Sequence, residues 1–544
     1  MQSRNARRNG PKGRLRAFSY ARLAVLFSMS LLGGCLPGYR WADDSDENEP
    51  LSSPALNRTY KSSFLALHVN SSGPPALRGQ FMPDAGPVVL TRFSTVEARR
   101  PANATSAAAP LAKPNGQPSE PETLPAAQAL EKFYIALSAL SSAKRSQPVT
   151  ILHLGDDRIV NDRFAGSLRE QLISRFGSAG RSLMAPGLFS LRGIKVERGG
   201  QWTLASAAAD SAGPFGITGV RVSSSASDAW LRFTSAQGPF DWFEVTFMTG
   251  PGRGSARVSF DGEVRLVPTA TLAVNQSSVR IAAKAREIMI RPNGDGEISV
   301  LSVAAGTNTP GIAYANLGLP GAAAWTPAKW DDGFASRDIG KLRPDLVILT
   351  YGTREAFTDE LDVRKYESQL SSLVERIRVW APQASILIVG PPDAARLPAF
   401  SSSAGAQACR ALNPQEIAAY SRLMERGDER LARWHAPPGL ESVRSALRRA
   451  AAASGSFYWD WAGYMGGPCS IHAWASLKPP LAAADHVTLT EAGEQRSARA
   501  LFAELMTGFD AYQRSMQSKA QTMVSVEGSQ QRPNKKGRKK EPKS

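Results

Sequence analysis

The sequence predicts an α/β fold, a three-layer α/β/α sandwich with a parallel sheet, interrupted by an inserted β-sandwich module. Short apolar runs such as Val149–Leu154 and Pro344–Gly352 alternate with amphipathic helical patterns, which is typical of parallel strands buried on both faces. Between about residues 200 and 303 apolar and polar residues alternate, which is typical of antiparallel strands. The second pattern divides the first into two parts.

The first part of the α/β domain is expected over residues 125–195. It opens with a helix over Ala126–Leu140, whose large apolar residues fall on one face. The buried strand Val149–Leu154 follows, and then a helix over Arg163–Phe176. Gly177 should end that helix, because glycine readily adopts the backbone conformation that closes many helices.

The inserted module is expected over residues 196–310. The run Asp241–Met248 alternates with its apolar residues on one face. The pair Asp261-Gly262 separates two alternating runs, a strong signal for a β-hairpin. The turn residues Pro292–Gly296 separate two further runs in the same way, and we expect a second hairpin there.

The second part of the α/β domain is expected over residues 311–508. It contains the strand Pro344–Gly352, a helix with Tyr366 and Ile377 in its apolar stripe, and the buried strand Ala384–Val389. Its last core helix is expected over Glu491–Met506, followed by a basic tail, residues 509–544.

The net charge of +17 lies mostly at the two ends of the chain. Residues 1–35 hold seven Arg and Lys and no acid, and residues 528–544 hold seven Arg and Lys and one acid. The folded part is therefore nearly balanced, and nucleic-acid binding is not predicted.

Residues 1–35 are interpreted as a signal peptide. A basic stretch precedes an apolar run of about ten residues, too short to span a bilayer, and the sequence LGGC follows. LGGC resembles the bacterial lipobox, in which Cys35 receives acyl chains. That resemblance implies a lipid anchor, and Leu36 after the cysteine implies sorting to the outer membrane, facing the periplasm. The alternative is a cleaved secretory signal with a chance cysteine.

Residues 36–124 are rich in Pro, Ser, Ala and Asn and are interpreted as a largely disordered tether. Without Cys35, the chain has two cysteines, Cys409 and Cys469. An oxidising envelope would permit a disulfide between them, and two buried thiols are the alternative.

Blocks of sequence then resemble the SGNH/GDSL hydrolase superfamily, and in particular its peptidoglycan O-acetylesterase-like branch, in which a β-sandwich interrupts the hydrolase domain. The resemblance covers about residues 126–506. The matching blocks occur in the family's order: ILHLGDDR, YANLGLPGAAA, LVILTYGTREAF, DWAGYMGGPCSIHAWA and ADHVTLTEAG.

The resemblance implies four catalytic roles, and three of the side chains that should fill them are replaced. Asp157 stands where the family has the serine nucleophile, Arg354 replaces an oxyanion-binding asparagine, and Thr488 replaces the histidine base. The oxyanion glycine persists as Gly321, and the aspartate that orients the histidine persists as Asp485. The sequence therefore predicts a pseudoenzyme without catalytic residues.

Two alternatives to this prediction are a shifted base and a metal site. His486 lies two positions before Thr488, so an extended segment would turn both side chains to the same side, and His486 could then serve as a base. Asp156 and Asp157 could hold a metal with His153, but His153 lies inside a buried strand and is expected to make a core hydrogen bond. No ligand spacing supports a metal site, and no cofactor is predicted.

The replacements at Asp157 and Arg354 also suggest an ion pair across the former oxyanion pocket, since the family's serine and asparagine face one another there. The alternative is that each side chain points separately to solvent.

Three functions remain open. The first is a non-catalytic envelope lipoprotein that binds a peptidoglycan-like glycan through the degenerate cleft or the module. Trp202, Trp230, Trp242, Trp325 and Trp330 are candidate sugar-binding aromatics, although most tryptophans are core residues. The second is an active O-acetylesterase that uses non-standard residues. The third is a scaffold that contacts envelope proteins through the tether and the tail, where Lys535–Lys540 reads KKGRKK.

Overall fold

The computed structural model describes residues 123–187, 191–209, 211–402 and 408–530. The predicted signal peptide with Cys35, the tether up to residue 122 and the run Lys535–Lys540 lie outside the described residues.

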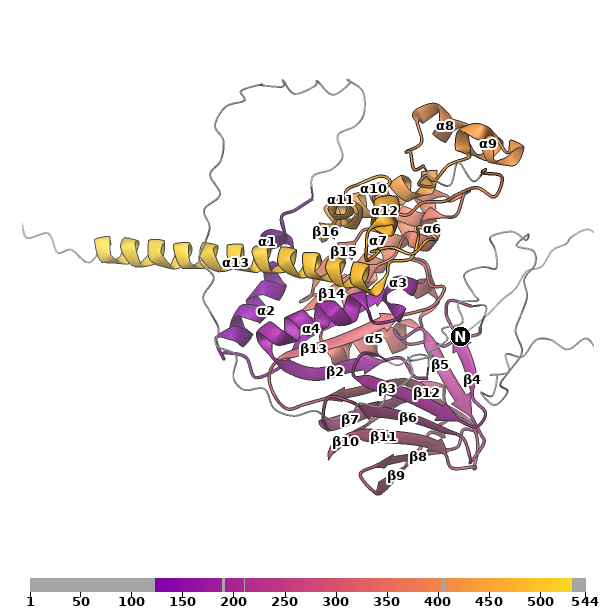
Figure 1. Ribbon diagram of the computed structural model, residues 1–544. Coiled ribbons are helices and arrows are strands. Elements are labelled where there is room, and N and C mark those ends of the chain that lie inside the picture. Colours follow the sequence, from indigo (N-terminus) through magenta and orange to yellow (C-terminus); the bar gives the residue numbers. More distant parts are fainter. Residues whose placement is uncertain (1–122, 188–190, 210, 403–407, 531–544) are drawn as a thin grey trace, which may run out of the picture. The chain divides into compact units, whose positions relative to one another are not determined.

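A central sheet carries the α/β domain, as the sequence predicts (Figure 1). Its parallel strands lie in the order β2-β13-β1-β14-β15-β16. Their bounds are β1 (Val149–Gly155), β2 (Ser178–Met184), β13 (Ile312–Gly318), β14 (Leu346–Thr350), β15 (Ser385–Val389) and β16 (Phe457–Trp459). The strands β1, β14 and β15 are buried along their whole length, which confirms the α/β fold class.

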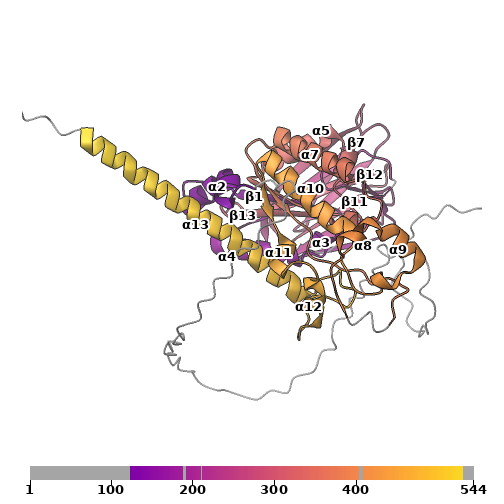
Figure 2. The same cartoon turned by 90° about the horizontal axis from the view of Figure 1, so that it is seen from above.

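Helices cover both faces of the parallel strands and make three layers. Figure 2 shows α5 (Asp332–Leu342), α7 (Val363–Trp380) and α10 (Pro438–Ser454) on one side of β1 and β13. The other side carries α2 (Glu131–Ser141), α4 (Phe164–Phe176) and α13 (Glu491–Gln530). The short helix α1 (Ala126–Ala129) contributes Ala126 to the core on that side. Alternate side chains of β1 enter the two resulting cores, Leu152 and Leu154 on the first side and Val149 and Ile151 on the second.

The inserted module is a β-sandwich that shares the central sheet. Beside β2, the sheet continues through β12 (Ile298–Gly306), β7 (Phe240–Thr249) and β10 (Asn275–Ala285), with β5 (Val220–Ser224) and β4 (Thr203–Ser206) paired at its edge. A second, antiparallel sheet runs β3 (Ile194–Gly199), β6 (Trp230–Ser235), β11 (Glu287–Pro292), β8 (Ser255–Phe260) and β9 (Glu263–Pro268). Apolar residues of both sheets, among them Phe243, Val245, Leu231 and Ile288, form one core.

The hairpin expected at Asp261-Gly262 joins β8 to β9, and both turn residues have positive φ, 45° and 81°. The prediction of a second hairpin is wrong. Pro292–Gly296 leads from β11 in the second sheet to β12 in the central sheet, so these residues carry the chain across the sandwich. Alternation shows that a strand has one buried face, but it does not show which strand is its neighbour.

Two helices differ from the prediction. The first divides at Leu130 into α1 and α2, and α13 continues past Met506 to Gln530 (Figure 1). Beyond the expected boundary at residue 508, Phe509 and Tyr512 are buried, and each ring lies about 6 Å from that of Tyr134. The packed part of the chain therefore extends beyond that boundary.

The remaining helices are short. They are α3 (Asp157–Val160), η1 (Thr326–Lys329), α6 (Thr353–Ala356), α8 (Pro414–Ala418), α9 (Tyr420–Arg426), η3 (Glu429–Leu431), α11 (Trp461–Met465) and α12 (Ser470–Ser476). Within the described ranges, no helix has both the length and the apolar composition that a membrane crossing requires.

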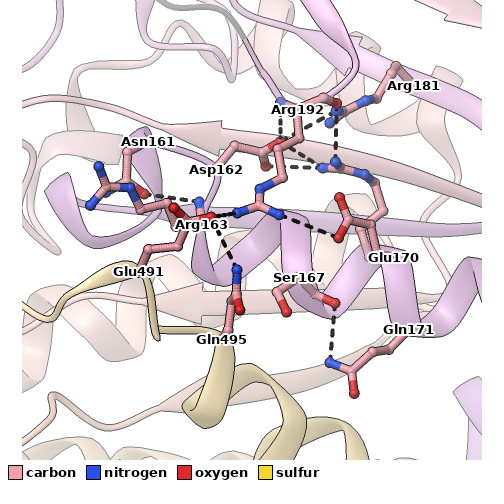
Figure 3. Close-up of polar contacts among 11 residues, drawn as sticks. Asn161, Asp162, Arg163, Ser167, Glu170, Gln171, Arg181, Arg192, Glu491 and Gln495 are labelled. Atoms are coloured by element: carbon pink, nitrogen blue, oxygen red, sulfur yellow. Dashed lines mark hydrogen bonds and ion pairs between the residues drawn. The ribbon is translucent and has the colours of Figure 1, made fainter. Parts of the chain in front are cut away.

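A buried ion cluster at Asp162 lies in the α/β domain next to the point where the chain enters the module (Figure 3). The fully buried carboxylate accepts two hydrogen bonds from Arg169 Nη1, at 3.0 and 2.9 Å, and one from Arg181 Nη2 at 3.3 Å. It also accepts the Arg192 N–H at 2.8 Å and the side-chain amide of Asn316 at 2.8 Å. These donors come from α4, β2, β13 and the segment before β3, so one carboxylate joins four parts of the chain.

Removal of this charge should be strongly destabilising. In Asp162→Asn, Arg169 and Arg181 would remain buried without their counter-ion, and we expect a loss of about 3–5 kcal/mol in the free energy of unfolding. Urea denaturation measures this loss. The matched control is Glu170→Gln, because the exposed Glu170 lies 3.5 Å from the half-buried Arg192, and it should change stability by less than about 1 kcal/mol. Equal effects of the two variants would contradict the importance of the cluster.

Candidate functional site

The candidate site lies where the carboxyl ends of β1, β13 and β14 meet. Strand β1 ends at Gly155, where a Cβ atom would lie 2.5 Å from the Thr350 carbonyl oxygen, so glycine allows the close approach. The next residue, Asp156, caps α3 by accepting the Arg158 N–H at 3.0 Å. This cap places Asp157 at the first residue of α3, at the rim of the site.

The Gly321 backbone is held from both sides by Asp157 and Arg354. The Gly321 N–H donates to both carboxylate oxygens of Asp157, at 3.2 and 3.1 Å. Arg354 Nη1 donates to the carbonyl oxygen of Gly321. The N–H that the family resemblance assigns to oxyanion binding is therefore hydrogen-bonded to a carboxylate of the same chain.

The direct ion pair expected between Asp157 and Arg354 is not formed. No ion pair of the described residues joins them, although Asp157 and Arg354 bind to the same Gly321 backbone. Their charges still interact. Loss of hydration raises the pKa of Asp157, and the Gly321 N–H and the charge of Arg354 oppose that rise. Both side chains are exposed at the rim.

Asp485 still orients the residue three positions later, but that residue is a threonine. One carboxylate oxygen accepts the N–H groups of Val487 and Thr488, at 2.9 and 2.8 Å. The other accepts the Thr488 hydroxyl at 2.7 Å. Because this hydroxyl donates to Asp485, and a hydroxyl is a poor proton acceptor, the arrangement offers no base of the imidazole kind.

His486 does not share the direction of Thr488. The segment is not extended, since His486 has a φ of 53°, and its side chain is 8% exposed. Its ring lies 3.8 Å from that of Trp434, and its Nε2 lies 3.0 Å from His472 Nδ1. Burial lowers the pKa of His486, and neighbouring His472 lowers it further. The left-handed backbone at His486 therefore directs its imidazole toward Trp434 and His472. The sequence pattern does not reveal this turn.

Arg158 is a site residue that sequence analysis missed. It is buried, its Nε donates to Thr353 Oγ1 at 3.2 Å, and its Nη2 donates to the Val487 carbonyl at 2.6 Å. It thereby joins the three segments that carry Asp157, Arg354 and Thr488. Its signal in the sequence is a cation immediately after the GDD of the first block.

Two buried acids lie beneath the rim. Asp156 is 2% exposed and Glu355 is 0% exposed. Glu355 accepts the Ala324 N–H at 2.8 Å, and within the described part of the chain the second carboxylate oxygen of each acid has no hydrogen-bond partner. Burial, and then the charge of Glu355, raise the pKa of Asp156 to about 8, and burial raises that of Glu355. Two ionised carboxylates in this buried position would repel each other, so protonation of the acids is favoured.

His153 makes the core hydrogen bonds that its position predicts. It is fully buried between the hydroxyls of Tyr314 and Thr350, at 2.7 and 2.8 Å. Burial lowers its pKa to about 3. Among the residues that the structure describes, no group of three or more His, Cys, Asp or Glu side chains could hold a metal ion.

Cys409 and Cys469 form a disulfide with an S–S distance of 2.07 Å, as the sequence suggests.

Of the candidate tryptophans, Trp202 and Trp330 belong to the core, with 6% and 7% exposure. Trp230, Trp242 and Trp325 are half-buried.

Comparison with known proteins supports the fold. No family model and no curated protein matches the chain. A solved peptidoglycan O-acetylesterase is 22% identical over 70% of this chain and 96% of its own, with a TM-score of 0.56. An acetyl xylan esterase covers 36% of this chain and 82% of its own, with 13% identity and a TM-score of 0.24. A GDSL-like lipase from Parabacteroides merdae covers 37% and 73%, with 14% identity and a TM-score of 0.23. The first likeness shows a shared SGNH-type fold.

The raised pKa of Asp156 predicts a pH dependence of stability. The ordinary value of 3.8 applies to the unfolded chain, so the folded state retains a proton at Asp156 up to about pH 8. The contribution of this group is most favourable at low pH and is lost as the pH rises toward 8. Asp156→Asn keeps a capping oxygen but removes the ionisation. In urea denaturation from pH 5 to pH 9, we expect the stability of Asp156→Asn relative to wild type to increase with pH. Parallel pH profiles would contradict the assignment.

Proposed function

We propose that this chain is a cell-envelope lipoprotein with an SGNH/GDSL hydrolase fold that has lost ester hydrolysis and binds an envelope glycan of the peptidoglycan type. The observation that carries the proposal is the double hydrogen bond from Gly321 N–H to Asp157. A built-in anion occupies the donor that an ester oxyanion would need.

The side chains around this donor also favour the loss of activity. Attack by the Asp157 carboxylate on an acetyl ester would give a mixed anhydride, and Thr488 is hydrogen-bonded to Asp485 rather than poised as a base. Loss of the nucleophile or the base of a serine hydrolase lowers turnover on the order of 10⁶-fold. Loss of one oxyanion donor lowers it by roughly 10²–10³-fold.

The histidines of the described residues offer no replacement triad. His153 contacts a threonine hydroxyl, but both groups are buried in the core, with 0% and 3% exposure. His435 is bound to Tyr420 and to the Arg433 carbonyl, and His472 and His486 contact each other. None of these contacts joins a histidine to a serine or cysteine side chain.

Envelope location and glycan binding have separate support. The predicted signal and Cys35 favour a lipid anchor, and the fold shared with a peptidoglycan O-acetylesterase favours a glycan ligand by analogy. A scaffold role for the tether and the basic tail is compatible with both features and would add envelope proteins as partners.

The proposal predicts that the purified chain has no esterase activity. With 4-nitrophenyl acetate and with O-acetylated peptidoglycan as substrates, wild type should release acetate no faster than Asp157→Ala and His486→Ala. A wild-type rate that disappears in either variant would contradict the proposal and favour an active O-acetylesterase with non-standard residues.

Two further measurements complete this test. The triple variant Asp157→Ser, Arg354→Asn, Thr488→His restores the family's residue types, and measurable hydrolysis by it would show that those positions alone limit turnover. Wild type should also sediment with insoluble peptidoglycan sacculi, with serum albumin as the control for non-specific adsorption. Failure to sediment above that control would contradict glycan binding while leaving the loss of catalysis intact.

A further inference from the structure

A polar groove of about 900 Å³ lies at the opposite end of the parallel strands from the candidate site. Its wall includes Pro148 before β1, Asp345 before β14 and Gln383 before β15, which mark the amino ends of these strands. Strands β7, β10 and β12 of the module and helix α5 complete it. Ligands of open α/β sheets usually bind at the carboxyl ends, so this groove is a separate feature produced by the inserted module.

Each acidic side chain of the groove already has a hydrogen-bond or ion-pair partner within the chain, but its negative charge stays in the groove wall. Asp345 accepts two hydrogen bonds from Arg145, at 2.9 and 2.8 Å, and the Thr150 N–H at 2.9 Å. Glu244 lies 3.3 Å from Lys341 Nζ. Asp338 accepts the Ile217 N–H at 3.1 Å, and burial raises its pKa to about 6.

Three cations of the groove are not compensated. Lys144, Arg280 and Arg343 are exposed in the groove wall. No ion pair within 4.0 Å connects any of them to a carboxylate of the described chain. Arg280 instead places its guanidinium 3.8 Å from the ring centroid of the half-buried Trp242. A stacked guanidinium keeps its N–H donors free at the edge, where they fit a carboxylate.

The indole of Trp242 is also fixed from below. A Cβ atom on Gly306 would lie 2.3 Å from Trp242 Cζ2, so the ring lies flat against the glycine of β12. Arg280, Trp242 and Gly306 are therefore stacked on one another in the groove wall. We call this stack the plate. Such a plate needs little ordering when a ligand binds.

The distribution of charge selects the class of ligand. A polyanion with a charge on every unit would be repelled by the carboxylates of Asp338, Glu244 and Asp345, although the cations would attract it. A chain with widely spaced carboxylates avoids them, and its neutral units can use the amide and hydroxyl groups of Gln147, Gln383, Asn308 and Thr309, which also line the groove.

We propose that this groove binds a glycan in which carboxylate-bearing sugars alternate with neutral, hydroxyl- and amide-bearing sugars. Lys144, Arg280 and Arg343 receive the carboxylates, and the plate formed by Arg280 and Trp242 positions one of them. The proposal extends the glycan binding of the proposed function to a second site and rests on that function only for the choice of a glycan.

The test uses the full chain and three hexasaccharide probes in isothermal titration calorimetry. A hyaluronan hexasaccharide carries a carboxylate on every second sugar, chitohexaose carries none, and a galacturonate hexasaccharide carries one on every sugar. We expect the hyaluronan probe to bind most tightly. Equal binding of chitohexaose, or tighter binding of the galacturonate probe, would overturn the proposed charge spacing.

Variants locate the binding in the groove. Lys144→Gln, Arg280→Gln and Arg343→Gln should each weaken hyaluronan binding about tenfold, the effect of losing one charge-assisted hydrogen bond. The matched control is Lys365→Gln, which removes an exposed cation of α7 outside the groove. Arg354→Gln, at the candidate site, should also leave this affinity unchanged. Weakening by Arg354→Gln instead of the groove variants would assign the glycan to the cleft, and equal weakening by Lys365→Gln would indicate non-specific attraction.

The outcomes are distinguishable from those of the proposed function. Failure of the wild-type chain to bind the hyaluronan probe, while it still sediments with sacculi, would overturn the groove as a glycan site and leave the proposed function standing. Esterase activity in wild type would overturn the proposed function while the groove titrations stand.

Discussion

The buried carboxylate of Asp162 is the constraint on which the packing of the α/β domain depends, next to the point where the chain enters the module. Two arginines, one backbone N–H and one side-chain amide converge on it from separate segments. A charge in this position is tolerated only while all of its partners remain in place, because each lost partner leaves an uncompensated group away from water. Asp162 directly follows the segment that carries Asp157 and Arg158, so the same cluster that orders the fold also fixes one wall of the candidate site.

The candidate site is a set of hydrogen-bonded contacts between segments that lie far apart in the chain. Each position that the family resemblance assigns to chemistry is hydrogen-bonded within the chain. Asp157 binds the Gly321 N–H, Arg354 binds the Gly321 carbonyl, and Thr488 binds Asp485. Arg158 joins the three segments from beneath. These contacts give the charged and polar groups of the site hydrogen-bond partners within the chain, and on them the proposed loss of ester hydrolysis rests.

The continuity of the central sheet explains the second feature of interest, the groove at the amino ends of the strands. Because β12 pairs with β2, the module extends the sheet of the α/β domain instead of forming a separate body. Its strands β7 and β10 therefore lie beside the loops that precede β1, β14 and β15, and these elements together line a polar groove. Neither the parallel strands nor the sandwich alone would contain it.

The sequence by itself determined the α/β class, the interruption by a β-rich module, and the residues at which the candidate site was expected. Burial periodicity and short blocks such as GDD and GTR are local, so they are readable without coordinates. The tertiary structure alone decided which groups meet: the Gly321 backbone between Asp157 and Arg354, the contact of His486 with His472, and the passage of Pro292–Gly296 between two sheets. The reason is physical. A residue's pattern specifies which of its faces is buried, whereas its partner depends on strand order and backbone turns contributed by segments far away in the chain.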